Sequence, residues 1–218
     1  LVARGRGEAV GTLGSNFLSN VQGMTVESSV INGIDPSVRG SMNAMPYVLH
    51  LKHVKVAVVG GTPVIQSKEG SYDTRLLLKR LATRLTVNWE YNVSGYKLNQ
   101  LLLQGIPLYY TVLDKPENDG TYPSLLSQFI ILEVPISDAN TAKGTYSCWV
   151  PANVRGESAT ATSDIQRIKA NAPIGSAFLN FIAVNTSDSK KKLDYRVYIG
   201  SGVSTDFNMY GNKDYVYD

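Results

Sequence analysis

Few side chains in this sequence could carry out catalysis or hold a metal ion. The two histidines, His50 and His53, are three residues apart in an expected strand, so they point to opposite faces unless a β-bulge turns one of them. The single cysteine, Cys148, has no histidine near it in the sequence, and a thiol nucleophile needs a base within hydrogen-bond reach. We therefore interpret the histidines as strand residues at a bend and Cys148 as a buried structural thiol.

The common catalytic motifs are missing from the sequence as well. There is no G-x-S-x-G nucleophile motif, no phosphate-binding glycine loop and no H-E-x-x-H zinc motif, and the carboxylates form no evident acid–base pair. We predict that the protein is not an enzyme, and we assign no catalytic, cofactor-binding or metal-binding residues.

Two arginines near the start, Arg4 and Arg6, are the candidates for contact with nucleic acid. Flexible cationic segments gain affinity for phosphate through counterion release, but two charges supply little of it. The net charge of +3 permits an RNA partner without arguing for one. A solvated or partner-bound tail is the alternative for this segment.

Composition favours an all-β protein with much of its surface covered by neighbours. The 218 residues suffice for one β-sandwich with a sizeable core or for two very small domains. Only 18% of residues are charged, whereas 19 are glycine and 13 are tyrosine. No apolar run approaches about 18 residues, so we expect no membrane span. The missing initiator methionine is compatible with cleavage from a polyprotein and equally with a trimmed chain.

Alternation of apolar and polar residues at every second position predicts the strands. These strands must position any functional site. The cleanest pattern places Leu85, Val87, Trp89, Tyr91 and Val93 on one face, which we expect to point inward together with Leu193, Val197 and Ile199. Residues 177–184 are apolar on both faces except at Asn180, which predicts a central, covered strand. The remaining expected strands are 47–59 with a bulge near 52–53, a short strand at 64–65, 106–113, 129–136, 145–150 and 193–199.

These elements predict a fold class and a domain division. The fold class is all-β: an eight-stranded antiparallel jelly-roll β-sandwich with one short helix and an extended N-terminal arm. The helix is expected over 73–82 and is capped by Asp73. A second, short helical piece is expected near 164–169 within a long polar loop. We divide the chain into an arm at 1–45, a jelly-roll domain at 46–210 and a C-terminal tail at 211–218.

The arm is rich in glycine, serine and asparagine and cannot bury enough apolar surface to order by itself. It nevertheless carries spaced apolar residues that a free tail would not need. We expect these residues to be ordered by neighbouring subunits. The candidate inter-subunit contacts are Phe17, Leu18, Val21 and Met24.

Two groups of residues resemble a known family. The first is Arg75-Leu76-Leu77-Leu78-Lys79-Arg80 followed by the strand from Leu85 to Tyr91. The second is residues 129–136, 144–151, 177–184 and 193–202, with Asp206-Phe207 after them. In order and spacing these resemble capsid proteins of picorna-like plant viruses, the secovirids of comovirus and cheravirus type.

The resemblance implies a structural coat protein, one of several jelly-roll subunits that assemble an icosahedral capsid around single-stranded RNA. Its partners would be other capsid proteins and copies of itself, and its location would be the virion, assembled in the host cytoplasm. The resemblance implies neither a cofactor nor a membrane partner, and it identifies no host attachment factor. The alternative is a carbohydrate-binding, lectin-like β-sandwich. A third interpretation, a β-sandwich hydrolase, lacks candidate residues.

Overall fold

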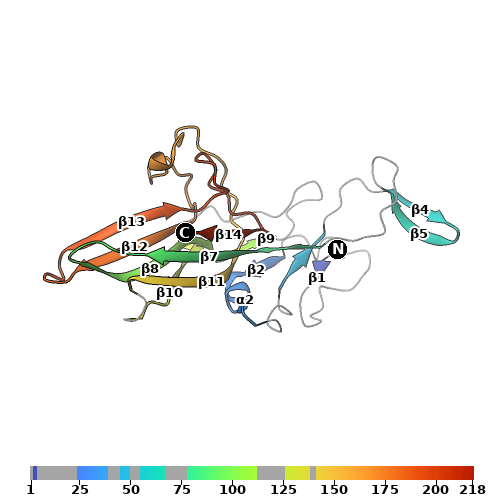
Figure 1. The fold of residues 1–218 in the computed structure, drawn as a ribbon. Helices are drawn as coiled ribbons and strands as arrows, with labels where there is room; N and C mark the ends of the chain where they lie inside the picture. The colour runs from blue at the N-terminus through green and yellow to red at the C-terminus, as the bar shows by residue number, and fades with distance from the viewer. Residues whose placement is uncertain are drawn as a thin grey trace.

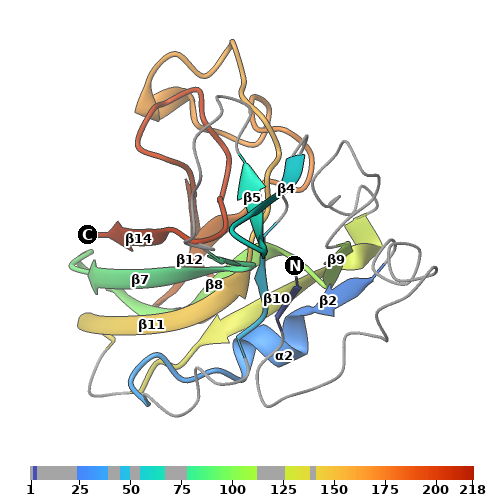
Figure 2. The same cartoon turned by 90° about the vertical axis from the view of Figure 1, so that its right-hand side faces the viewer.

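The computed structural model describes residues 2–3, 24–38, 45–49, 55–66, 78–111, 126–137 and 141–218. Two sheets form the body of the protein, and the core lies between them (Figures 1 and 2). The three-stranded sheet has the order β11-β7-β14, made of Lys143–Pro151, Ala82–Glu90 and Asp214–Tyr217. The four-stranded sheet has the order β10-β8-β12-β13, made of Phe129–Val134, Tyr96–Pro107, Phe178–Asn185 and Lys192–Tyr198.

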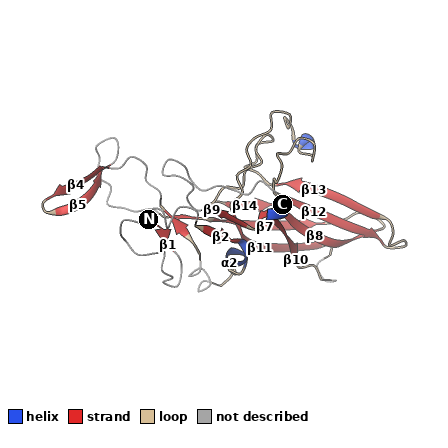
Figure 3. Ribbon diagram, turned by 180° about the vertical axis from the view of Figure 1, so that it is seen from behind, coloured by secondary structure: helices blue, strands red, loops and turns tan. Residues whose placement is uncertain are grey.

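The expectation of an all-β protein is confirmed, because strands dominate the described residues and α2 (Ser28–Asn32) is the one α-helix among them (Figure 3). The jelly-roll is not confirmed. Strand β14 pairs with β7 in parallel, from Asp214 opposite Arg84 to Tyr217 opposite Val87, which departs from a purely antiparallel sandwich. The coarser description, a β-sandwich, is the one that these strands support.

Strand β7 shows how the alternating pattern builds the core. Leu85, Val87 and Trp89 are buried, and Trp89 is only 5% exposed, as predicted. Ile199 is also buried as predicted, and Tyr91 and Val197 are half-buried against the same cluster. Val93 and Leu193 were expected to point inward, but they are 42% and 39% exposed. Both lie at the open end of the sandwich, where no further layer covers them among the described residues.

The helix expected over 73–82 is wrong for the part that the structure describes. Lys79–Arg80 form strand β6, and β7 begins at Ala82. Residues 73–77 lie outside the described ranges. Tertiary pairing overrides the local helical pattern here, because β6 pairs with β3 (Tyr47–Val48) and the amide of Leu81 donates to the carbonyl of Pro46. The helical piece expected near 164–169 is present as a short 3-10 helix, Asp164–Gln166.

Strand β8 is much longer than expected at its start, since only residues from 106 onward were predicted as strand. Its residues in the main apolar core are Leu98, Leu101, Leu103 and Ile106, so the period of two is broken twice along the strand. Register shifts in both of its pairings accompany these breaks. Gly105 has φ of +73°, a conformation that favours glycine. Because of these irregularities, β8 lacks the regular alternation of apolar and polar residues that predicts a strand.

Four shorter pairings complete the described structure. Strands β1 (Val2–Ala3), β3 and β6 form one small sheet, and β2 (Thr25–Glu27) pairs with β9 (Tyr109–Thr111). The predicted strand at 47–59 is divided into β3 and β4 (Lys55–Val59), and β4 forms a hairpin with β5 (Thr62–Gln66). The predicted bulge and both histidines lie outside the described residues. A second 3-10 helix spans Leu126–Gln128.

The described part of the arm packs on its own chain. Helix α2 contacts β11, and Ile31, Ile34 and Met45 are buried in a second apolar cluster with Ala82 and Trp149. Ile31 and Ile34 thus give residues 24–38 apolar contacts within their own chain. That neighbouring subunits order the arm stays a prediction.

Candidate functional site

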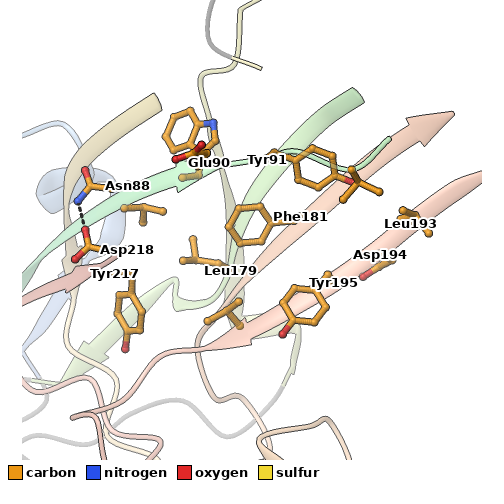
Figure 4. Close-up of a pocket in the computed structure, with 14 residues that line it drawn as sticks. Asn88, Glu90, Tyr91, Leu179, Phe181, Leu193, Asp194, Tyr195, Tyr217 and Asp218 are labelled. Atoms are coloured by element: carbon orange, nitrogen blue, oxygen red, sulfur yellow. Dashed lines mark hydrogen bonds between the residues drawn. The ribbon is translucent and has the colours of Figure 1, made fainter. Parts of the chain in front are cut away.

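A cavity of about 520 Å³ opens between the two sheets at one side of the sandwich (Figure 4). Its apolar lining comes from β7 and from β12, β13 and β14, three strands that follow one another much later in the sequence. The lining residues are Val87, Asn88, Trp89, Glu90, Tyr91, Val93, Leu179, Phe181, Leu193, Asp194, Tyr195, Val197, Tyr217 and Asp218. We call this cavity the edge groove.

The edge groove exists because both sheets end on the same side. Strand β13 is the last strand of the four-stranded sheet, and β14 is the last strand of the three-stranded sheet. Strand β14 pairs with β7 only as far as Val87, whereas β7 continues to Glu90. Beyond that point the inward-facing side chains of β7 and β12 border an opening instead of a closed core.

Figure 4 shows Leu179 and Phe181 in the middle of the groove, with Tyr217 and Tyr195 on either side of them. Phe181 and Leu179 project from β12 toward β7, because alternate residues of this strand face the core. Tyr195 is 68% exposed although it is a large aromatic residue. The floor of the groove is therefore continuous with the core, while its mouth exposes apolar surface to water.

Tyr217 fixes the closed end of the groove. Its hydroxyl donates to the carbonyl of Gly200 at 2.9 Å and accepts from the amide of the same residue at 2.8 Å. Burial raises the pKa of Tyr217, so the phenol is neutral at physiological pH and its hydrogen bonds are retained. Burial also raises the pKa of Tyr91 near the mouth. Both tyrosines thus act as uncharged groups.

The rim of the groove is acidic. Glu90, Asp194 and Asp218 line it, and none of its described lining residues is a lysine or an arginine. The amide of Asn88 donates to a carboxylate oxygen of Asp218 at 2.7 Å, which holds that carboxylate beside β7. An apolar floor with a negative rim is suited to bind an apolar segment that carries a positive charge.

The predicted contacts with RNA and with other subunits stay predictions. Arg4, Arg6, Phe17, Leu18 and Val21, the candidates for RNA and subunit contact, lie outside the described residues. Met24 is half-buried against the second apolar cluster of its own chain, which explains its burial without a neighbouring subunit.

Cys148 is buried, as expected for a structural thiol. Desolvation raises its pKa to about 12, so the reactive thiolate form is negligible at neutral pH. Within the described residues no group of three histidine, cysteine or carboxylate side chains is placed to hold a metal ion. In the same ranges, no helix combines the length and the apolar character needed to cross a membrane.

Sequence reasoning missed the edge groove because it treated residues 211–218 as a tail. The signal was present in the alternation Asp214-Tyr215-Val216-Tyr217, whose two tyrosines are half-buried and whose other two residues are exposed. Such a short pattern predicts a strand, but not its partner. The parallel pairing with β7, which lies more than a hundred residues earlier in the sequence, is set by the tertiary structure.

Comparisons with known proteins give a partial match to a family model, distant matches to solved structures and one negative result. A protein-family model described as "Domain of unknown function (DUF4906)" matches residues 148–218, about a third of the chain. A solved structure, the tip fimbrial protein Mfa3 from Porphyromonas gingivalis with C-terminal truncation, is similar at 12% identity with a TM-score of 0.39. The match covers 82% of this chain and 66% of that one, so the chain spans just under two thirds of the fimbrial protein. No protein with a curated description matches.

These findings correct the interpretation as a viral coat protein. The family model carries no assigned function and does not point to a coat protein, and the similar solved structure is a bacterial fimbrial protein. The expected capsid function and the location in a virion are therefore wrong. The residues behind the resemblance were mainly strands in a certain order and spacing, which β-sandwich proteins of unrelated function share. At a TM-score of 0.39, the likeness to Mfa3 carries no argument about what this chain does.

Proposed function

We propose that this chain is a non-catalytic binding and assembly protein whose edge groove accepts an extended segment of a partner polypeptide. The observation that carries the proposal is the groove itself, an apolar opening between the last strands of both sheets. The partner segment would continue the sandwich there as one more strand.

Exposed apolar surface supports a partner at this place. Leu193 is 39% exposed, Val93 42% and Tyr195 68%, and all three lie at the mouth of the groove. Clustered exposed apolar residues on a folded domain mark interaction sites more often than isolated ones do. A segment bound over them would gain about 25 cal/mol for each Å² of apolar surface that it removes from water.

The backbone at this side of the molecule also suits an extended segment. Strand β13 has a paired neighbour, β12, on one side only, so it is an edge strand of the described sheet. Edge strands offer outward N–H and C=O groups in the spacing that another strand requires. The alternating side chains of such a segment would enter the groove at every second residue.

The acidic rim defines the chemistry of the partner more closely. Glu90, Asp194 and Asp218 attract a segment with lysine or arginine beside its apolar residues. We accordingly propose a partner segment with alternating apolar residues and a basic residue at one or both ends.

The proposal that the chain is not an enzyme has separate support from Cys148. A thiol that is 6% exposed, with a pKa of about 12, is neither accessible nor ionised enough to act as a nucleophile. Iodoacetamide should therefore modify Cys148 in the folded protein far more slowly than in guanidinium. Rapid, selective modification of the folded chain would contradict this part of the proposal.

A synthetic peptide tests the groove directly. The probe is an eight-residue peptide in which valine alternates with threonine, with a lysine at each end, and its control replaces the central valine with proline. We expect titration calorimetry to show binding of the first peptide only, and hydrogen exchange to show new protection of β13 amides. Equal binding of the proline peptide, or binding without protection of β13, would refute strand addition.

Matched variants locate the binding surface. Leu193→Asp and Tyr195→Asp place a charge at the mouth of the groove and should weaken peptide binding about tenfold or more. Ile165→Asp changes a residue that is 86% exposed on the loop between β11 and β12, and it should leave binding unchanged. If all three variants behave alike, the peptide does not bind in the groove.

A further inference from the structure

A second cavity of about 390 Å³ lies on the outer face of the four-stranded sheet, on the side opposite to the core. Its floor is formed by side chains of β8, β10, β12 and β13, and residues 169–176 of the loop before β12 border it. We call it the outer pocket. Its volume falls within the usual range of sites for small ligands, about 300–1,000 Å³.

Aromatic side chains from neighbouring strands make the floor. Phe178 of β12 is opposite Gln104 on one side and Tyr198 on the other, so these three residues form a row across the sheet. The rings of Phe178 and Tyr198 are 5.2 Å apart. Phe129 of β10 extends the apolar surface beyond Gln104. A single amide thus lies within an aromatic floor, in which the rings of Phe178 and Tyr198 are tilted by 44° against each other.

Cations surround this floor. The guanidinium of Arg196 lies 5.1 Å from the ring centre of Phe178, and that of Arg155 lies 5.7 Å from the ring centre of Phe129. Lys169 lines the pocket from the loop side, and none of the described lining residues is a carboxylate. Asp194 does not line the pocket, but one of its oxygens is 3.8 Å from Arg196 Nε and offsets part of that charge. Lys169 and Arg196, without a carboxylate among the described lining residues, still give the outer pocket a positive lining.

The backbone under the floor excludes an extended peptide as the ligand. Strands β8 and β12 are interior strands of the sheet, paired on both sides, so their main-chain groups are already used. A ligand over these two strands binds through their side chains, with an apolar face against the rings and an anionic group at the cations. A sugar ring with an acidic substituent has this combination, because its C–H face is apolar and its hydroxyls can reach the amide of Gln104.

We infer that the outer pocket binds an acidic saccharide, with the sugar ring on Phe178 and Phe129 and its carboxylate or sulfate held by Arg196 and Lys169. This site is separate from the edge groove. On β13, Arg196 and Tyr198 face the outer pocket, whereas Tyr195 and Val197 face the groove. The two sites therefore occupy opposite faces of the same strand and can be tested independently.

The test is a titration of the full chain, followed by calorimetry and saturation-transfer NMR. The probes are glucuronic acid, N-acetylneuraminic acid and galactose 6-sulfate, with galactose and sodium acetate as controls. We expect at least one acidic sugar to bind with its ring protons saturated and neither control to bind comparably. A preference for the carboxylated or for the sulfated sugar identifies the anionic group. Equal binding of galactose, or equal competition by acetate, overturns the inference.

Charge variants on exposed side chains complete the test without disturbing the fold. Arg196→Gln and Lys169→Gln should each weaken binding of the preferred sugar about tenfold, the usual effect of losing one charge-assisted hydrogen bond. Lys190→Gln removes the same charge at the exposed turn between β12 and β13 and should have no effect. Leu193→Asp, which blocks the groove, should also have none. Unchanged affinity in both Arg196→Gln and Lys169→Gln would refute the site.

Discussion

At the scale of single residues, Trp89 and Arg167 show two ways in which one side chain holds distant segments together. The indole of Trp89 lies against Gly144, its pairing neighbour on β11, so closely that no Cβ fits between them. Arg167 joins the loop before β12 to the loop after β13. Contacts with close neighbours fix the side-chain conformation of both residues, and intrinsic rotamer preference does not.

Replacing Trp89 with alanine should cost about 3–5 kcal/mol in the free energy of unfolding, because this large side chain is only 5% exposed and packs in the core. Denaturant unfolding followed by circular dichroism measures this loss. Ile165→Ala, at a residue that is 86% exposed, is the control and should change stability little. A loss below 1 kcal/mol for Trp89→Ala would show that the core can collapse around the missing ring.

Arg167 makes an unusually large set of contacts for one side chain. Its Nη1 donates to the carbonyls of Val203 at 3.0 Å, Ser204 at 2.7 Å and Asp206 at 2.8 Å. Its Nη2 donates to the carbonyl of Tyr198 at 3.1 Å, and the guanidinium lies 4.5 Å from the ring centre of Phe207. The planar fork of donors therefore organises the connection from β13 to β14.

We expect Arg167→Lys to destabilise the protein almost as much as Arg167→Ala, about 2–4 kcal/mol, because an ammonium group cannot reach all these carbonyls. Hydrogen exchange at residues 203–207 should rise in both variants. The control is Arg196→Lys on the exposed outer face of β13, which should keep wild-type stability. Full stability in Arg167→Lys would mean that charge alone is sufficient at this position.

At the scale of elements, β14 is the strand on which the edge groove depends. It carries Tyr217, whose hydroxyl binds Gly200, and Tyr215, whose hydroxyl donates to the carbonyl of Asn208 at 3.2 Å. Both anchors lie on one side of the strand, and Val216 between them is 61% exposed. Strand β14 is thus attached by its tyrosines and by its ladder to β7.

Tyr215→Pro tests the contribution of that ladder, because the amide of Arg84 donates to the carbonyl of Lys213 and this parallel register turns the backbone of Tyr215 toward β7. Relative to Tyr215→Ala, we expect a further loss on the order of 2 kcal/mol in stability and a loss of peptide binding at the groove. Tyr215→Ala removes the same side chain but keeps the backbone amide, so the difference between the two variants measures the ladder. Wild-type peptide affinity in Tyr215→Pro would show that the groove does not depend on β14.

At the scale of the whole molecule, the N-terminal segment is part of the folded unit. Ile31 and Ile34 of this segment are buried with Trp149 of β11, so α2 packs against one end of that strand (Figure 1). The N-terminal segment is therefore attached to the sandwich at β11.

Ile31→Ala should destabilise the protein by about 2–4 kcal/mol, because the side chain is fully buried against the sandwich. Val30→Ala, one residue earlier in the same helix and 50% exposed, is the matched control and should cost much less. Thermal unfolding of both variants measures the difference. Equal and small losses in the two variants would indicate that α2 contributes little to the stability of the sandwich.

The sequence alone determined the features that depend on local pattern. Regular alternation in β7 predicted its buried face, including Trp89, and the lack of polar partners near Cys148 predicted a buried thiol. Turn and loop signals placed β10, β11, β12 and β13 within a few residues of their observed bounds. In each case one face of a single strand is apolar, and burial of that face is the dominant local requirement.

Tertiary structure decided the features that depend on pairing between segments distant in the sequence. Two bulges concealed β8, pairing with β3 turned residues 79–80 from an expected helix into a strand, and the parallel pairing of β14 formed the groove. Neither cavity is visible in the sequence, because each collects side chains from four strands whose order in the sheets differs from their order in the chain. Local propensity amounts to a few tenths of a kcal/mol per residue, and packing of a whole strand exceeds it.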